Sequence, residues 1–549
     1  MKHPFYLYLF FIVICSLNLQ AQGLLTERNN FSRQDTLRGS ITPERVWWNL
    51  TYYHLEVTVD PDKKYISGKN TIKYTVLNVY QTMQIDLQTP LRITKVTQDG
   101  TALEIIHEGN AHFIKLKKEQ IVGNTESIVV HYKGNPKEAV RAPWDGGFSW
   151  KKDKNGNHFV ATSCQGLGAS VWWPCKDHMY DEVESMRISV TVPSHLMDVS
   201  NGRLESIEDH GATKTYNWFV DNPINNYGVN VNIGDYTHFS EVFDGEKGPL
   251  DMDYYVLKYN LEKAKKQFRD APKMMKAFEH WFGPYPFYED GYKLVEVPYL
   301  GMEHQSSVTY GNEFKQGYLG RDLSGTGWGL KFDFIIIHES GHEWFANNIT
   351  DIDIADMWIH ESFTNYSESL FLDYYYGKKA ASEYVIGLRK TIANKIPIIG
   401  KYNVNKSGSS DMYNKGGNML HTLRQLIDND KKWRQILRTM NAEFYHQTVT
   451  TKQIENFLSK ETGFNLNPFF NQYLRTIKIP TLAYVLKNNT LKYHWTHVVS
   501  NFKMPLKITI NGDEKWIYPT ENWKEITLNS DEHSLIIDEN FYVFTKKEN

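Results

Sequence analysis

The sequence predicts a multidomain α+β protein with three successive regions. Many short segments between residues 45 and 240 alternate apolar and polar side chains with a period of two, which is typical of antiparallel β structure. After residue 250 apolar residues recur every three or four positions, as in amphipathic helices. Beyond Pro480 the period of two returns, which predicts a small second β domain. The length of 549 residues is ample for several domains with cores of their own.

The first 21 residues, MKHPFYLYLFFIVICSLNLQA, predict a secretory signal peptide. One lysine precedes an apolar run from Phe5 to Leu17, and Ala21 is a small residue at a suitable cleavage point. The run is too short for a comfortable membrane span, and no second long apolar run follows. We therefore expect cleavage after Ala21, export to the periplasm or the extracellular space, and no stable membrane span. An uncleaved anchor is the alternative.

Composition narrows the classes of function. The formal net charge is only −3 and no long run of like charge occurs, so we expect no nucleic-acid partner. After cleavage two cysteines remain, Cys164 and Cys175. An exported chain allows them to form a disulfide, but two buried free thiols are an equal alternative. Neither belongs to a CxxC pair or a cysteine cluster, so cysteine is not the expected metal ligand.

Individual segments support the three regions. In the predicted N-terminal β domain, residues 22–243, Tyr53, Leu55 and Val57 alternate with polar residues. In the predicted mostly helical domain, residues 244–478, the spacing is helical at positions such as Leu261, Ala264 and Phe268. In the predicted C-terminal domain, residues 479–549, the alternating residues Leu506, Ile508 and Ile510 precede a turn signal, Asn511-Gly512-Asp513.

Two histidines and a glutamate lie within five residues, as HESGH at 338–342. On a helix His338 and His342 lie on one face, one turn apart, so their imidazole nitrogens converge on one ion. Glu339 lies near the same pocket, where it is available as a general base. The alternative is a partly exposed helix with polar side chains. Three isoleucines and Phe345 flank the motif and indicate a buried helix instead, in which His and Glu need partners.

A catalytic zinc ion usually takes a third protein ligand and leaves one position open. The next segment, DIADMWIHESFTNYSES, contains His360 and Glu361, and its Trp358 and Phe363 indicate a second packed helix. Neighbours on a helix point about 100° apart, so only one of these two residues can bind the ion. The spacing alone does not choose between them.

The pattern HExxH-x18-E, with Glu361 inside WIHESFTNY, resembles the zinc aminopeptidases of the aminopeptidase N and leukotriene A hydrolase family. The resemblance implies that His338, His342 and Glu361 bind one zinc ion, and that Glu339 takes a proton from the zinc-activated water. It covers most of the mature chain and implies that the helical domain is thermolysin-like and that the C-terminal domain is a β-sandwich. His360 stands where the family usually has Asn.

The stretch PYLGMEHQSSVTY at 298–310 resembles the family's Gly-x-Met-Glu-Asn strand, which lies along the substrate. The resemblance implies that Gly301 and Met302 line the substrate and that Glu303 binds its free α-amino group. A carboxylate near zinc that pairs with the substrate's ammonium group fixes which peptide bond lies at the zinc. It therefore admits only peptides with a free N-terminus. Leu300 and His304 depart from the family pattern. The alternative for Glu303 is an ordinary solvated glutamate.

Two further stretches resemble the family. SCQGLGASVWWPCKD at 163–177 implies that Gln165 contacts the first residue of the substrate, with a purely structural glutamine as the alternative. DMYNKGGNML at 411–420 implies that Tyr413 donates a hydrogen bond to the oxyanion, although Asn414 replaces the usual Glu. About 70 residues follow Pro480, fewer than the long helical domain of many members needs, so we expect a more open site or one closed by a partner protomer.

The sequence therefore predicts an exported zinc metallo-aminopeptidase that acts on peptides with free N-termini. A thermolysin-like zinc endopeptidase and a non-catalytic peptide-binding protein of the same fold are the alternatives. Because all three expected ligands and the expected base are present, the non-catalytic alternative is disfavoured, and no residue points to epoxide hydrolysis. The preferred N-terminal residue and the oligomeric state are left open.

Overall fold

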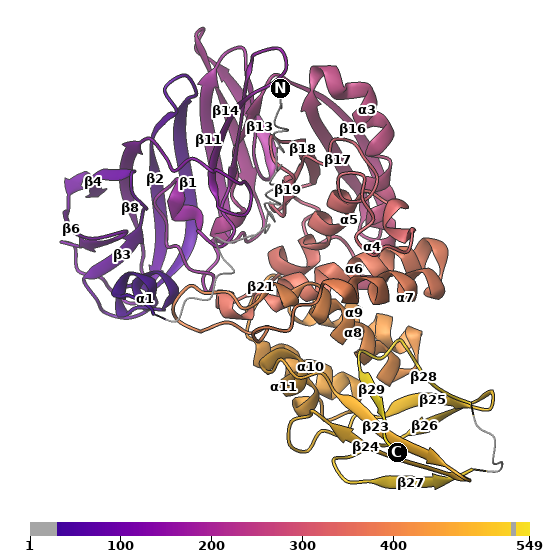
Figure 1. The fold of residues 1–549 in the computed structure, drawn as a ribbon. Helices are drawn as coiled ribbons and strands as arrows, with labels where there is room; N and C mark the ends of the chain where they lie inside the picture. The colour runs from indigo at the N-terminus through magenta and orange to yellow at the C-terminus, as the bar shows by residue number, and fades with distance from the viewer. Residues whose placement is uncertain (1–29, 529–533) are drawn as a thin grey trace, which may run out of the picture.

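The computed structural model describes residues 30–528 and 534–549, and it confirms the predicted α+β fold class. Figure 1 shows an N-terminal group of β-sheets, a central region of helices with a sheet of its own, and C-terminal strands at the opposite end of the molecule. The predicted signal peptide, residues 1–21, lies outside the described residues. No helix within the described residues is both long and apolar enough to cross a membrane.

An eight-stranded sheet dominates the N-terminal region. Tyr53, Leu55 and Val57 of its strand β1 are buried, as the alternation predicted. One departure from the antiparallel expectation is the parallel pairing of β1 with β11, in which Leu55 faces Ile188. The strands follow the order β13 (Arg203–Asp209), β14 (Thr213–Val220), β11 (Ser185–Pro193), β1 (Trp48–Asp60), β2 (Tyr65–Val76), β8 (Thr125–Gly134), β4 (Arg92–Gln98) and β5 (Thr101–Ala102).

Two smaller sheets and two short helices complete this region. One sheet consists of β12 (Met197–Val199), β15 (Asn232–Gly234), β10 (His158–Ser163) and β9 (Gly147–Lys152). The other consists of β3 (Thr82–Asp86), β7 (Ala111–Lys115) and β6 (Glu104–Glu108). The helices, at the start of the described chain, are α1 (Arg33–Gly39) and α2 (Pro43–Val46).

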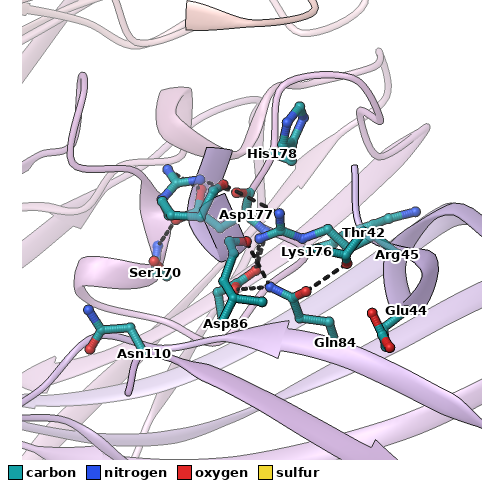
Figure 2. Close-up of polar contacts among 12 residues, drawn as sticks. Thr42, Glu44, Arg45, Gln84, Asp86, Asn110, Ser170, Lys176, Asp177 and His178 are labelled. Carbon is teal, nitrogen blue, oxygen red and sulfur yellow. Dashed lines mark hydrogen bonds and ion pairs between the residues drawn. The ribbon is translucent and has the colours of Figure 1, made fainter. Parts of the chain in front are cut away.

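A buried polar network joins these helices to the segment that ends in Asp177 (Figure 2). Asp86 accepts hydrogen bonds from Arg45 Nη2 at 2.6 Å, from Gln84 Nε2 at 2.8 Å and from the backbone N–H of Asp177 at 3.2 Å. Because a buried carboxylate with three donors holds them in one geometry, the network fixes the end of the 163–177 segment. The cysteines of that segment, Cys164 and Cys175, are buried free thiols.

The central region contains a five-stranded sheet that the helical periodicity did not predict. Its strand β18 is buried at every position, so it shows no alternation of apolar and polar residues. The predicted boundary between residues 243 and 244 lies inside β16. The order is β16 (Tyr236–Gly245), β17 (Gly248–Leu257), β18 (Tyr292–Glu296), β20 (Val308–Tyr310) and β19 (Gly301–Met302), with β19 at the edge that faces the N-terminal sheets (Figure 1).

The central region has nine α-helices within the described residues. They are α3 (Leu261–Gln267), α4 (Asp270–Phe282), α5 (Phe334–Gly341), α6 (Trp358–Tyr376), α7 (Lys378–Gly387), α8 (Asn414–Ile427), α9 (Asp430–Glu443), α10 (Thr451–Thr462) and α11 (Asn467–Arg475). Helix α6 has 19 residues and is buried from Trp358 to Leu372, and α4, α5, α7 and α8 pack against it. A two-stranded sheet joins the segment before α6 to the segment before α10. Its strands are β21 (Ile349–Asp351) and β22 (Gln447–Val449).

Glycines allow two helices to approach α6 closely. A Cβ atom at Gly341 of α5 would lie 2.7 Å from Ser367 Oγ, and one at Gly416 of α8 would lie 2.6 Å from Ser362 Cβ. Both distances are below the separation that real Cβ atoms keep, so a Cβ at Gly416 would force the two helices apart, and one at Gly341 would displace the Ser367 hydroxyl. The middle of the HESGH motif thus has a packing role.

The C-terminal strands form two sheets that share a hydrophobic core with the helices. The turn signal is confirmed: Asn511 and Gly512 both have positive φ and connect two antiparallel strands as a two-residue hairpin loop. The sheets are β27 (Lys524–Thr527), β24 (Thr490–Thr496), β23 (Thr481–Lys487), β29 (Phe544–Lys547), and β26 (Asp513–Ile517), β25 (Leu506–Ile510), β28 (Leu535–Ile537).

The close packing of α8 on α6 leads to a stability prediction. Alanine normally stabilises a helix relative to glycine, but Gly416→Ala should lower the free energy of unfolding by about 1–3 kcal/mol because its Cβ collides with Ser362. Denaturation midpoints of the wild type, Gly416→Ala, Ser362→Gly and the double variant measure this. The double variant should lose less stability than the sum of the two single losses. Additive losses would show that this contact is not the cause.

Candidate metal centre

The HESGH motif lies on α5, which begins at a well-formed N-cap. The Asp333 carboxylate accepts the backbone N–H groups of Ile335 at 3.1 Å and Ile336 at 3.3 Å, two donors that the first turn leaves without helical partners. His338 lies in the last turn and His342 caps the helix. The chain then leaves α geometry, and Ala346 has a φ of +149°. Both histidines and Glu339 are buried.

The break after α5 orients the second histidine. Because Phe345 and Ala346 are not helical, the Phe345 carbonyl turns back and lies 3.0 Å from His342 Nδ1. Thr364 Oγ1 of α6 lies 3.1 Å from the same nitrogen. A histidine whose Nδ1–H is donated to a carbonyl presents the lone pair of Nε2 on the other side of the ring.

A glutamate that the sequence reasoning missed orients the first histidine. Glu368 Oε1 lies 2.7 Å from His338 Nδ1, and Tyr384 donates its hydroxyl to the other oxygen of Glu368 at 2.5 Å. Glu368 follows Glu361 by seven residues, which is two helical turns and therefore the same face of α6. That spacing was the signal in the sequence. A carboxylate on Nδ1 fixes the tautomer that a metal-binding histidine needs.

Both Nε2 atoms face Glu361 on α6. Glu361 Oε2 lies 3.8 Å from Nε2 of His338 and 3.4 Å from Nε2 of His342. Ligand atoms of the three residues lie within 4.8 Å of one another, and all three side chains are buried. The structure thus brings the three predicted ligands together.

These residues fit a zinc ion. Glu361 Oε2 is buried and has no hydrogen-bond partner within the described chain, although a buried carboxylate oxygen is costly to leave unpaired. Donor atoms about 2.0–2.2 Å from one tetrahedral ion lie about 3.3–3.6 Å apart, which is close to the two separations seen here. Two imidazoles and one carboxylate form a donor set of the catalytic type, which leaves a fourth position for water. His338, His342 and Glu361 would hold the ion.

The three residues also form one electrostatic unit. Burial alone would lower the pKa of His342, but the Glu361 carboxylate outweighs that effect and raises it. In return, burial alone would raise the pKa of Glu361, but the rings of His342 and His338 hold it well below its ordinary value. The carboxylate is therefore kept ionised, which is the form that binds a metal.

His360, the other candidate for the third ligand, points away from the cluster. Its Nε2 accepts the backbone N–H of Asp351 at 2.8 Å. Burial lowers the pKa of His360 to about 3, so the ring is neutral. The choice that spacing left open is therefore made by the direction of α6, which presents Glu361 and not its neighbour to the two histidines.

Glu339 occupies the same pocket without joining the three ligands. Burial raises its pKa to about 7. Glu339, Glu303 and His342 also bring ligand atoms within 4.8 Å of one another. A Cβ atom at Gly301 would lie 2.6 Å from Ile335 Cγ2 and 3.3 Å from Glu339 Cγ, so β19 approaches α5 closely only because position 301 has no side chain.

Glu303 follows β19, and a glutamine from the turn after β10 in the N-terminal region binds it. Gln165 Nε2 donates to Glu303 Oε1 at 2.5 Å and to Glu361 Oε1 at 3.0 Å. The Gln165 side chain thereby links Glu303, which is predicted to bind the substrate's α-amino group, to Glu361, the predicted third zinc ligand. Glu303 is 3% exposed, which contradicts the alternative of a solvated glutamate.

The residues around Glu303 hold the strand in place. Asn347 Nδ2 donates to the Glu303 carbonyl at 3.1 Å, and buried Met302 pairs with Thr309 across β19 and β20. His304, which departs from the family pattern, lies 3.2 Å from Thr309 Oγ1 through its Nδ1. Burial lowers the pKa of His304 to about 3, so this replacement adds no positive charge beside Glu303.

Tyr413 lies at the start of α8, against the first histidine. Its ring stacks on that of His338 with the centroids 6.1 Å apart and the planes at 26°. Burial, followed by the carboxylates of Glu361 and Glu303, raises the pKa of Tyr413 well above its ordinary value. Tyr413 is therefore a protonated hydrogen-bond donor at neutral pH, beside the cluster.

The geometry predicts which variants lose the metal. Purified wild-type protein should contain about one zinc per chain, whereas His338→Ala and Glu361→Gln should contain almost none. Glu368→Gln should weaken zinc affinity about 10–100-fold because His338 loses its orienting carboxylate. Elemental analysis and chelator titration measure this. His360→Asn is the matched control and should keep its zinc. Zinc retained in Glu361→Gln, or lost in His360→Asn, would contradict the assignment.

Comparison with solved structures agrees with this architecture. An M1 zinc metallopeptidase mutant from Deinococcus radiodurans, bound to a Tyr-Ser-Ala substrate, superimposes with a TM-score of 0.67 at 18% identity, covering 80% of this chain and 98% of that one. At this identity the likeness shows a common fold.

Comparison with curated proteins finds distant relatives. Probable aminopeptidase 1 of Sulfurisphaera tokodaii is 21% identical over 459 residues, 76% of this chain and 56% of that protein. Leukotriene A-4 hydrolase of Xenopus laevis is 22% identical over 448 residues, 76% of this chain and 68% of that protein. The chain thus spans little more than half the length of the first of these relatives.

Family models match the two parts of the chain that form the centre. The Peptidase M1 N-terminal domain matches residues 49–227, which include Gln165, and the Peptidase family M1 domain matches residues 267–473, which include Glu303, the HESGH motif and Glu361. The chain belongs to peptidase family M1.

Proposed function

We propose that this protein is a zinc-dependent aminopeptidase that hydrolyses the first peptide bond of peptides with free N-termini. The observation that carries the proposal is the position of Glu303, whose carboxylate lies within 4.8 Å of a ligand atom of His342 and is bound by Gln165. A buried carboxylate beside the metal ligands is a partner for an ammonium group. The names of the relatives, among them Probable aminopeptidase 1, support the same activity.

Glu303 would set the register of the substrate. Pairing of its carboxylate with the α-ammonium places the first peptide bond, and no later one, at the cluster of His338, His342 and Glu361. Gln165 holds Glu303 through its side-chain N–H, and its side-chain carbonyl would be a further acceptor for the same ammonium. Gly301 and Met302 form the strand along which the substrate would lie.

Bound zinc would lower the pKa of a water molecule at its open position and polarise the scissile carbonyl. Glu339 would accept the proton of the attacking water and then pass it to the leaving amine, a role that suits a carboxyl whose pKa is about 7. Tyr413, protonated and stacked on His338, would donate its hydroxyl proton in a hydrogen bond to the oxyanion.

A thermolysin-like endopeptidase is the second candidate for the activity. The substrate of an endopeptidase continues on the N-terminal side of the scissile bond. An endopeptidase therefore needs an uncharged binding groove on that side. In the proposed binding mode Glu303 would occupy that side, and Gln165 links Glu303 to the ligand Glu361. A buried negative charge at this place is costly for an internal peptide, which brings no cation to pair with it. The geometry therefore favours the aminopeptidase.

Export is a separate part of the proposal. The first 21 residues have a signal-peptide pattern, and the mature protein would begin at Gln22 and act in the periplasm or outside the cell. We expect a protein expressed with its native N-terminus to appear in the exported fraction, with Gln22 as its first residue by N-terminal sequencing. Retention in the cytoplasm with an intact N-terminus would contradict this.

The aminopeptidase proposal is tested with free and N-acetylated versions of the same aminoacyl and peptide substrates. Wild type should cleave only the free substrates. Glu339→Gln should lower kcat by at least about 100-fold while zinc content stays near one per chain, because the base is lost but no ligand is. Glu303→Ala should lose the preference for free substrates. Equal cleavage of free and acetylated peptides by wild type, or full activity of Glu339→Gln, would contradict the proposal.

Gly301 gives a test that leaves every polar residue in place. Gly301→Ala should lower kcat/KM by at least about tenfold, because its Cβ would collide with Ile335 and press on Glu339. Ile335→Ala is the matched partner: it removes Cγ2, the atom that the new Cβ meets, and should restore part of the loss in the double variant. Zinc content and melting temperature measured in parallel separate displacement of Glu339 from unfolding. Wild-type activity in Gly301→Ala would show that the close approach has no catalytic role.

A further inference from the structure

A wide groove in the central region is lined by residues other than those of the metal centre. Most of its lining comes from three segments: one face of α9, the end of α4 with the loop that follows it, and the turn between β16 and β17. Its volume is about 810 Å³, within the range of about 300–1,000 Å³ that is usual for small-ligand pockets. None of the residues assigned above to the metal, the base, the substrate or the oxyanion lines this groove.

Every charged side chain that lines the groove is basic. Lys431, Arg434 and Arg438 lie three and four positions apart, which puts them on one face of α9, and Lys247 comes from the turn between β16 and β17. Arg438 is balanced, because its Nη2 pairs with Glu246 Oε2 at 2.7 Å. The other three cations pair with no carboxylate within the described residues. The whole chain has a formal charge of −3, so this concentration of positive charge is local.

The partner of Arg434 is a neutral ring. Arg434 Nη1 donates to His280 Nε2 at 3.0 Å. Burial, and then the cations of Arg434 and Arg438, lower the pKa of His280. A guanidinium has five N–H donors and one ring nitrogen accepts only one of them, so the others are available to an oxyanion. Because Arg434 is half-buried, water and salt screen such a pairing less than they would at an open surface.

The two lysines have weak partners or none. Lys247 Nζ lies 3.4 Å from the Tyr445 hydroxyl and 5.0 Å from the centroid of the same ring, and both are contacts with a neutral group. Lys431 is exposed and makes no hydrogen bond or ion pair with any described residue. Both side chains are long and flexible, with three donors on the ammonium group, so both can turn toward a charge in the groove.

Acidic residues near the groove do not balance these cations. Arg424 already pairs with Asp430 at 2.8 Å and with Asp373 at 2.6 Å. Burial, and then the carboxylate of Glu289, raise the pKa of Tyr445 to about 12, but Glu289 forms no ion pair with a lysine or arginine of the groove in the described chain. The repulsion among the three cations is therefore left for an anion from outside the chain to relieve.

We infer that this groove binds a small phosphate monoester, with the phosphate held by Arg434, Lys431 and Lys247. A phosphate monoester carries about −1.5 to −2 charges at pH 7 and three strong acceptor oxygens, which matches three cations better than a single carboxylate does. Arginine commonly binds two of these oxygens at once. The apolar body of the ester would contact Pro284 and the Tyr445 ring, which line the same groove. The inference is independent of the proposed aminopeptidase activity, because no residue of the metal centre takes part.

The test is calorimetric titration of the zinc-loaded protein with phenyl phosphate near neutral pH. Wild type should bind one molecule with a Kd below about 1 mM, and added salt should weaken the binding, because charges carry it. Arg434→Gln should raise the Kd at least about tenfold, since a charge-assisted pair in a half-buried site is lost. Lys431→Gln should raise it at least about threefold and keep the wild-type melting temperature, because Lys431 has no described partner to lose. Absence of saturable binding by wild type would overturn the inference.

Lys432→Gln is the matched control. It removes the same charge from the next position of α9, but Lys432 Nζ donates to the Thr462 carbonyl at 3.1 Å and the side chain does not line the groove. Its Kd should stay within about twofold of the wild-type value. An equal rise of the Kd in Lys431→Gln and Lys432→Gln would mean that the overall charge of α9 attracts the ester, and would overturn the groove as its site.

Two further measurements separate the groove from other sources of binding. Glu361→Gln, which should lack zinc, should bind phenyl phosphate as tightly as wild type, and loss of binding there would place the ester on the metal and overturn the inference. Sedimentation with phosphatidylglycerol vesicles, compared with phosphatidylcholine vesicles, distinguishes a lipid headgroup from a free ester. We expect no excess on the anionic vesicles. Vesicle binding without binding of phenyl phosphate would overturn the inference in favour of a membrane surface.

Discussion

The buried carboxylate of Glu361 is the constraint on which the rest of the centre depends. Charge in a protein interior is unfavourable unless it is paired, and here two imidazole rings face the same carboxylate oxygen. Bringing these groups together requires α5 and α6 to approach closely. Gly341 on α5 permits that approach, and Gly416 permits the same on the side of α8, which carries Tyr413.

The face of α6 toward α5 supplies more than the third ligand. Glu368 orients His338, and Thr364 contacts His342, so one helix both binds the ion and fixes the two rings that share it. Seven residues of spacing between Glu361 and Glu368 make this possible, because they put both carboxylates on one face. The strained turn at Ala346 completes the arrangement by turning the Phe345 carbonyl toward His342.

The N-terminal sheets complete the centre from outside the helical region. Gln165 contacts both Glu303 and Glu361, and the segment that carries it ends at Asp177, which the Asp86 network holds (Figure 2). The two regions have separate hydrophobic cores, and Met302 packs in the core of the N-terminal one. Strand β19 therefore lies at the junction of two hydrophobic cores, and Glu303 follows directly after it.

The sequence by itself determined what local periodicity and spacing encode. The β, α, β order, the Asn511-Gly512 turn and the placement of His338 and His342 on one helical face follow from periods of 2 and 3.6. The buried strand β18 escaped this reasoning because a strand covered on both faces has no alternation. The choice of Glu361 over His360 needed the direction of α6, since neighbours on a helix differ only in where they point. Tertiary packing alone brought Gln165 to Glu303, because contacts between residues more than a hundred positions apart depend on how whole elements pack.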